Sequence, residues 1–222
     1  MAGTLPCDAR PWPGSLAGVA ESLRGAARGA YTEALEAGGV GKRPVKCASS
    51  RKLVFTVGHS TRTCQEFLAL LRAHGVRLLV DVRTVPRSRH NPQFNQDALR
   101  AALRRARIGY RHTKGLGGLR HPRQDSPNGA WRNASFRGFA DYMQTPEFTE
   151  NLERLAELAR RRPAAIMCAE AVPWRCHRSL IADALLVRGW RVEELSSLSS
   201  TRVHKLTPWA KVRGKRVLYP AE

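Results

Sequence analysis

The chain has 222 residues, of which 42% are hydrophobic, so it is long enough for one sizeable core and short for two. Its 38 Lys and Arg residues against 18 Asp and Glu residues give a net charge of +20, which lies outside the usual range of soluble enzymes and suggests a polyanionic partner. No apolar run approaches the roughly 20 residues that span a bilayer. No basic helix shows a clean aromatic face either, so we expect nucleic acid or a nucleotide as the partner and no membrane association.

The positive charge belongs to the body of the chain. Residues 1–50 carry six basic and four acidic side chains, which leaves +18 for residues 51–222. Residues 1–14 are proline-rich, 15–37 could form an Ala-rich helix and 38–50 have the composition of a linker. We therefore expect a flexible extension over 1–50, disordered or weakly helical, and one domain over 51–222.

The cysteine content indicates a reducing compartment. Five cysteines at irregular spacing do not resemble a secreted disulfide framework, and the first residues lack the charged and apolar regions of a secretory signal. We expect a cytoplasmic location. The sequence gives no indication of the oligomeric state.

The first half of the domain predicts a βαβ unit. An apolar run over 53–57 indicates a buried strand, 63–75 has helical spacing with a threonine available as N-cap, and 77–86 indicates a second strand. A basic helix over 95–109 follows, and then a short strand and a glycine loop over 110–118. The crossover of such a unit is expected to be right-handed in a parallel sheet.

The second half continues the alternation. Residues 119–135 indicate a long surface loop, 136–162 two helices separated near Thr145 and Pro146, 164–170 a buried strand, 178–189 a helix and 190–195 a final strand. Residues 204–220 are basic and irregular. The pattern predicts a single Rossmann-like three-layer α/β domain with a mostly parallel sheet.

The predicted strands end next to residues that could react or bind anions. In open α/β sheets, ligands bind beyond the carboxyl ends of the strands, where helix N-termini favour anions. We therefore expect one site at this edge, built from four strand ends. Its candidate residues, in strand order, are His59 and Ser60; Asp81, Arg83, Arg87, Arg89 and His90; Lys114; and Cys168, Glu170, Cys176, His177 and Arg178.

Two residues near the end of the fourth strand are candidates for catalysis. Cys168 and Glu170 are two positions apart, so their side chains point to the same face of a strand. Glu170 could act as general acid or base, or as a nucleophile toward a sugar carbon. The alternatives are an ion pair of Glu170 with Arg83 or Arg178, and a purely structural Cys168 buried as a small apolar residue.

Cys176 precedes the helix predicted at 178. The helix dipole, together with Arg175 and Arg178, would favour the thiolate expected of a nucleophile, although a solvent-facing turn thiol would give the same pattern. His59 and Asp81 are further catalytic candidates.

The cysteines and histidines do not have the spacing of a typical metal site. Cys168, Cys176 and His177 supply three potential ligands and His59 a fourth, but paired C-x-x-C spacing is absent. We therefore expect no metal.

Several basic residues could hold phosphate. Arg83, Arg87, Arg89 and Arg178 are the main candidates, Ser60, Lys114 and His177 could assist, and Phe94 could stack on a base. A solvated basic loop is the alternative for the stretch RSRHNPQFN. The GLGG loop has no G-x-G-x-x-G context, which makes a mobile turn the simpler interpretation. We expect no cofactor.

Six motifs occur in an order that resembles a known family: TVGHS, LLVDVRTVPRSRHNPQFN, IGYRHTKGLGG, FRGFADYMQTPEF, IMCAE and CHRSLIADAL. The chain resembles the bacterial and archaeal family called domain of unknown function 488 from about residue 53 to Val192, and on through HKLTPWA to Tyr219. The resemblance implies a compact Rossmann-like domain and no established reaction. Thr84 and Glu194 depart from the family pattern, which often has serine and histidine there. The implied signature positions are His59, Ser60, Asp81, Arg83, Pro86, Arg87, Cys168, Glu170, Cys176, His177 and Arg178.

Three functions remain open from the sequence. The leading hypothesis is an enzyme that acts on a nucleotide-containing substrate, expected to be nucleic acid, by hydrolysis or group transfer, with Glu170 or Cys168 as the reactive group. The second is a noncatalytic nucleic-acid-binding module in which the cysteines and Glu170 are structural. The third is a thiol redox or metal-responsive regulator that uses Cys168 and Cys176.

Overall fold

The computed structural model describes residues 52–221. The extension predicted over 1–50 lies outside these residues. Within them the chain forms a six-stranded sheet and a separate two-stranded one, with five α-helices. The strands are β1 (Leu53–Gly58), β2 (Leu78–Asp81), β3 (Gly109–His112), β4 (Ala164–Cys168), β5 (Arg191–Leu195), β6 (Thr201–Val203), β7 (Lys211–Arg213) and β8 (Arg216–Leu218). The helices are α1 (Cys64–Ala73), α2 (Gln96–Arg105), α3 (Ala134–Tyr142), α4 (Pro146–Arg161) and α5 (Arg178–Leu186).

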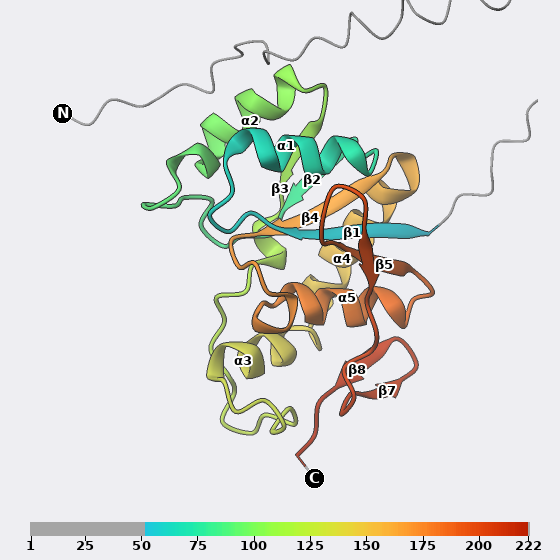
Figure 1. The fold of residues 1–222 in the computed structure, drawn as a ribbon. Helices are drawn as coiled ribbons and strands as arrows, with labels where there is room; N and C mark the ends of the chain where they lie inside the picture. Colours follow the sequence, from blue (N-terminus) through green and yellow to red (C-terminus); the bar gives the residue numbers. More distant parts are fainter. Residues whose placement is uncertain (1–51, 222) are drawn as a thin grey trace, which may run out of the picture. The chain divides into compact units, whose positions relative to one another are not determined.

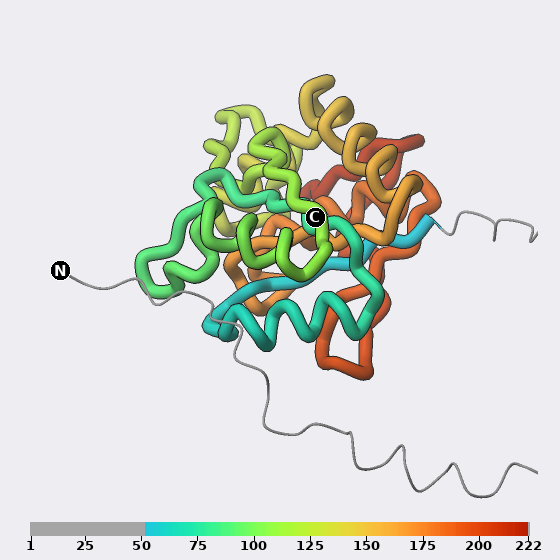
Figure 2. Tube along the Cα trace, turned by 90° about the horizontal axis from the view of Figure 1, so that it is seen from above, coloured from blue at the N-terminus to red at the C-terminus, as the bar shows by residue number. Residues whose placement is uncertain are grey.

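The main sheet has the strand order β3-β2-β4-β1-β5-β6. Strands β1 to β5 pair in parallel, and only the edge strand β6 pairs antiparallel, with β5. Helices α1 and α2 lie side by side on one face, whereas α3, α4 and α5 cover the other (Figures 1 and 2). This arrangement confirms the predicted three-layer α/β domain with a mostly parallel sheet.

Two apolar cores fill the spaces between the layers. One packs α1 and α2 against the sheet around Phe67, Leu71 and Leu103. The other packs α3, α4 and α5 against the opposite face around Phe139 and Leu152. The central strands β2 and β4 are buried along most of their length, as expected for strands covered on both faces, so each reads as a continuous apolar run.

The helix boundaries follow local signals in the sequence. At α1, the Thr63 side chain accepts a hydrogen bond from the Glu66 backbone and the Glu66 side chain accepts one from Thr63, which forms a capping box. At α4, Thr145 caps the helix and Pro146 occupies the first turn, where no backbone donor is needed. The predicted separation of two helices at this point is confirmed.

The C-terminal region is more regular than predicted. Residues 211–218 form a β-hairpin, β7 and β8, in which Arg213 pairs with Arg216 across the two-residue turn Gly214-Lys215. Gly214 has φ +60°, and a glycine in this conformation at the first turn position is typical of tight hairpins. Within residues 52–221, no helix has both the length and the apolar character needed to cross a bilayer.

Candidate functional site

A cavity of about 640 Å³ opens at the carboxyl edge of the main sheet. Its walls come from the residues that follow β1, β2 and β4, from Gly118 and Leu119, and from the start of α3. Neighbouring strands β1 and β4 lead to helices on opposite faces, α1 on one and α5 on the other (Figure 1). The cavity therefore lies at a topological switch point, the usual ligand site of an open α/β sheet.

The backbone approaches itself closely where β1 and β4 end. A Cβ added at Gly58 would lie 2.0 Å from the carbonyl oxygen of Glu170, so only glycine fits at this point. The next residues continue the pairing, since the Ser60 amide donates to the carbonyl of Ala169 at 2.9 Å. Ser60 has φ 48°, which is uncommon for a residue other than glycine. The two strand ends thus fix the position of the Glu170 turn.

His59 and Arg83 form a buried, tightly held part of the cavity wall. Asp81 lies fully buried and binds the Arg83 guanidinium through both carboxylate oxygens, at 2.7 Å from Nη2 and 2.9 Å from Nε. Arg83 Nη1 lies 3.5 Å from His59 Nε2, and the His59 ring stacks on Phe94 with 4.2 Å between centroids. Burial, reinforced by Arg83, lowers the pKa of His59 to about 4, so its imidazole is neutral at pH 7.

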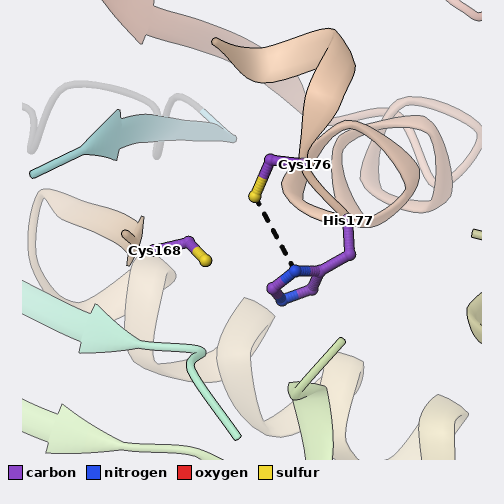
Figure 3. A group of neighbouring side chains, drawn as sticks. All are labelled: Cys168, Cys176 and His177. Carbon is purple, nitrogen blue, oxygen red and sulfur yellow. Dashed lines mark hydrogen bonds between the residues drawn. The ribbon is translucent and has the colours of Figure 1, made fainter. Parts of the chain in front are cut away.

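Cys176 and His177 form a thiol–imidazole pair in the cavity wall (Figure 3). His177 Nε2 lies 3.1 Å from the carbonyl oxygen of Val82, which can only accept, so Nε2 carries a hydrogen. The other ring nitrogen, Nδ1, faces the Cys176 sulfur at 3.7 Å. A base oriented by a third group beside a thiol is the arrangement that activates a nucleophile.

Cys168 completes this group from the end of β4. The ligand atoms of Cys168, Cys176 and His177 all lie within 4.8 Å of one another, and the two cysteine sulfurs point toward the same space in Figure 3. The pKa of Cys176 is lowered well below its usual range, first by a hydrogen bond from the Cys168 thiol. The hydrogen bond and charge of His177 and the charge of Arg178 lower it further. The hydrogen bond between the two thiols and burial raise the pKa of Cys168. Of the two thiols, Cys176 is therefore the one that ionises more readily.

Glu170 lines the same cavity, with its carboxylate held by one backbone donor. Its Oε1 accepts from the Val172 amide at 3.2 Å. The ion pair considered for Glu170 is not formed among residues 52–221, because Arg83 binds Asp81 and Arg178 donates to the backbone carbonyl of Glu170 at 2.6 Å. The carboxylate is available to a ligand in the cavity.

The structure brings most of the predicted site residues together. The cavity is lined by His59, Ser60, Arg83, Arg87, Cys168, Glu170, Cys176 and His177. The exposed side chains of Arg89 and Lys114 are not among its lining residues, and neither is Asp81, which is occupied by Arg83 and by the hydroxyl of Tyr110.

Two of the expected ligand contacts do not fit the structure. Phe94 is fully buried between His59 and Phe67, so it cannot stack on a base. Arg178 is also fully buried and does not line this cavity, because its side chain lies beneath the Glu170 turn. Arg83 lines the cavity, but its guanidinium is committed to Asp81 and to the carbonyl of Phe94.

Other residues of the site were missed or misread from the sequence. Arg175 is exposed at the cavity wall and was considered only for its effect on Cys176. Gly118, in the loop interpreted as a mobile turn, also lines the cavity, and a Cβ there would lie 2.5 Å from the His177 ring. The glycine provides room for the imidazole. Two adjacent glycines after a short strand were the only signal of such a close approach.

The three-residue group could also hold a metal ion. Two thiolates and an imidazole match the ligands of zinc sites that keep a fourth position open, and the His177 Nε2 bond to a backbone carbonyl is a typical outer contact of a metal-bound histidine. The sequence offers the same three residues as potential ligands, but we expected no metal from it, because they lack C-x-x-C spacing. Cys168 ends β4 and Cys176 lies eight residues later, just before α5, so the fold and not a short motif brings them together.

Comparison with known proteins gives one match. The model of the family described as domain of unknown function DUF488 matches residues 63–185. No curated protein and no solved structure matches the chain. Because the family match covers more than half of the chain, the protein belongs to the DUF488 family; the matched residues include the ends of β2 and β4 and the thiol group of the cavity.

Proposed function

We propose that the protein is an enzyme that acts on a nucleotide-containing substrate by hydrolysis or group transfer, with Cys176 as its nucleophile. The observation that supports this most directly is the contact of Cys176 with His177 Nδ1, while Nε2 is fixed on Val82. This pair faces a cavity large enough for a small substrate. The proposal moves the reactive role from Cys168 to Cys176, since hydrogen bonding lowers the pKa of the latter.

The proposed chemistry uses three side chains. The Cys176 thiolate attacks an electrophilic centre of the substrate and forms a bond through Sγ, while the leaving group departs with a proton from His177 or Glu170. Water or a second substrate, deprotonated by the same group, then releases the product and restores the thiolate. Glu170 suits this role because its carboxylate lines the cavity and is held in place by the Val172 amide.

Arginines at the cavity wall support a phosphate-bearing substrate. Arg87 and Arg175 are exposed there, and neither forms an ion pair with another of the described residues. Guanidinium groups bind phosphate oxygens in pairs of hydrogen bonds, and a net charge of +20 favours approach of a polyanion. Reactive thiols also suit the reducing cytoplasm expected from the sequence.

A turnover assay tests the catalytic proposal. The full chain is incubated with mononucleotides, dinucleotides, and single-stranded RNA and DNA, and products are identified by liquid chromatography and mass spectrometry. Cys176→Ser and Glu170→Gln should lose turnover, whereas Cys64→Ser, which removes a thiol outside the cavity, should keep it. Full activity in Cys176→Ser would refute the nucleophile, and full activity in Glu170→Gln would refute the role of the carboxylate.

A binding assay separates the enzyme from a noncatalytic module. We expect affinity for single-stranded nucleic acid to fall with salt, and Arg87→Glu/Arg175→Glu to reduce the slope of log K against log salt by about 2. Arg213→Glu/Arg216→Glu is the matched control, because both arginines are exposed on the β-hairpin, away from the cavity. Salt-dependent binding through this cavity without turnover of any substrate would favour the module.

A metal-dependent or thiol-based regulator is the second candidate, favoured by the approach of three ligand atoms to within 4.8 Å. Elemental analysis of the purified protein tests it. One zinc per chain that is lost in both Cys168→Ser and Cys176→Ser would make these residues ligands, and the nucleophile would be excluded. Less than a tenth of an equivalent, with turnover intact, would exclude the metal.

A further inference from the structure

A second cavity, of about 650 Å³, lies on the other side of the segment 173–179. Cys176 and His177 of this segment line the first cavity, whereas Trp174, Arg178 and Ser179 line the second. Most of the remaining wall comes from β5, β6 and the chain that follows β6, and Thr56 of β1, Trp131 and Ala182 of α5 complete it. Neither the thiol pair nor Glu170 lines this space, so it can bind a ligand of its own.

The fold builds this cavity by fixing the C-terminal chain onto α5. Asp183 of α5 is fully buried and accepts hydrogen bonds from His204 Nε2 at 2.7 Å, from the hydroxyl of Thr207 at 2.6 Å and from the hydroxyl of Tyr219 at 2.8 Å. The chain from His204 to Trp209 is thereby held beside α5 and forms one wall. The wall is anchored by a buried network and is not a loosely attached tail.

Three of the chain's five tryptophans gather at this cavity. Trp131 and Trp209 contact edge to face, with ring centroids 5.4 Å apart. Trp174 remains 63% exposed and Trp209 42% exposed, and the Arg202 guanidinium lies 5.0 Å from the Trp174 ring centre. Indole faces left open to solvent beside a cationic group are the surfaces on which planar bases stack.

Two buried polar atoms at this cavity have no partner. Arg178 is fully buried; its Nη2 donates to the Glu170 carbonyl, but its Nε has no hydrogen bond among the described residues. The Nε1 of Trp131 is likewise buried without a partner in this part of the chain. Arg178 also forms no ion pair within residues 52–221. A buried guanidinium without an ion pair is costly, and its uncompensated charge favours an anionic group of a ligand in the adjoining cavity.

Glu194 gives the cavity a carboxylate as well. It lines the cavity near Arg178 and Arg202, and none of residues 52–221 hydrogen-bonds its carboxylate oxygens. Burial raises the pKa of this carboxyl group, and the charges of Arg178 and Arg202 oppose that shift. A ligand for this cavity therefore needs N–H donors opposite Glu194, a flat ring for the tryptophans and an anionic group for the arginines.

We propose that this second cavity binds a guanine nucleotide, with the base stacked on the tryptophans and its N–H edge on Glu194. Guanine carries adjacent imino and amino donors that match the two oxygens of a carboxylate, whereas adenine and uracil mix donors with acceptors on that edge. The phosphate of the same nucleotide pairs with Arg202 or Lys205, which are exposed at the rim. The proposal does not depend on the chemistry of the Cys176 cavity.

Calorimetric titration of the full chain tests the ligand. GMP, AMP, CMP, UMP and inorganic phosphate are compared with single-stranded oligonucleotides of guanine and of adenine. We expect GMP or the guanine oligonucleotide to bind at least tenfold tighter than the adenine counterpart, and phosphate alone to bind far more weakly. If GMP binds tighter than the guanine oligonucleotide, the ligand is a free nucleotide. If the guanine oligonucleotide binds tighter, the ligand is nucleic acid. Equal affinity for all bases, or no binding, would overturn the proposal.

Variants assign the binding to this cavity. Trp174→Ala should weaken GMP binding roughly 5- to 100-fold, as expected for loss of one stacking surface. Leu198→Ala is the control, because this leucine is similarly exposed, at 59%, but does not line the cavity. Glu194→Gln should reduce the preference for GMP over AMP by about tenfold. Unchanged affinity and preference in both cavity variants would overturn the proposal. Cys176→Ser should keep GMP binding, so failure of the proposed catalysis is seen separately.

Discussion

The pH dependence of Cys176 alkylation follows directly from the geometry of the thiol group. An ordinary cysteine, with a pKa near 8.5, is roughly 0.3% thiolate at pH 6 and about a quarter thiolate at pH 8, so its alkylation rate rises roughly 75-fold. Cys176 has its pKa lowered by the hydrogen bond from Cys168 and then by His177. It should already be thiolate at pH 6, and its rate should change less than threefold over the same interval.

The measurement uses iodoacetamide and peptide-resolved mass spectrometry on protein freed of metal by a chelator. Each rate is compared with that of the same cysteine in guanidinium chloride, where the ordinary profile applies, so limited access to the buried sulfur does not affect the comparison. In the folded protein, Cys168→Ala should make the alkylation rate of Cys176 rise most steeply with pH, and His177→Asn less steeply. The reason is that the hydrogen bond from Cys168 is the larger cause of the lowered Cys176 pKa. Parallel profiles in the folded and unfolded wild type would refute the assignment of Cys176 as the thiolate.

Three further predictions concern groups around the cavities. Gly118→Ala should push aside the His177 ring, 2.5 Å from the new Cβ, and make Cys176 alkylation more pH-dependent at an unchanged circular dichroism spectrum. Asp183→Ala should lower the free energy of unfolding by about 3–5 kcal/mol in a urea titration, because it removes a buried charged acceptor of several hydrogen bonds. Phe94→Ala should lower the free energy of unfolding by about 3–5 kcal/mol in the same titration, because the ring is fully buried. An unchanged free energy of unfolding would mean that the ring is at the surface, where it could stack on a base.

The sequence was sufficient to predict the layers of the fold and the sheet edge at which the first cavity opens. Continuous apolar runs such as that of β4 and helical spacing such as that of α1 are local patterns, and parallel strands necessarily bring their carboxyl ends to one edge. This explains why His59 could be placed beside Cys168 and Cys176 although it is far from both cysteines in the chain.

The roles of individual side chains depend on packing that the sequence does not display. An aromatic ring in a basic loop reads equally as a stacking surface or as core, and Phe94 is core because His59 and Phe67 enclose it. Arg83 resembled a phosphate ligand, but Asp81, two positions earlier, neutralises it. The hairpin of β7 and β8 had a local signal in its R-G-K-R turn, which the surrounding basic residues obscured.

The second cavity illustrates a longer-range limit. Glu194 departs from the histidine that the family often has at that position, and it is not among the site residues expected from the sequence. It lines the second cavity, because the chain after β6 returns to α5. That return depends on Asp183, whose partners lie 21 to 36 residues further along. Pairings at such separations leave no periodic pattern in the sequence.

Arg178 connects the two cavities physically. Its Nη2 donates to the Glu170 carbonyl at 2.6 Å, which fixes the turn that carries the candidate general acid, while its side chain also lines the second cavity. A ligand in the second cavity would therefore act on the same guanidinium that holds the Glu170 turn. Arg178 is therefore a positioning residue and not a phosphate ligand of the first cavity. Its burial explains why: a guanidinium enclosed by β1, the Glu170 turn and α5 can reorient only if these elements move with it.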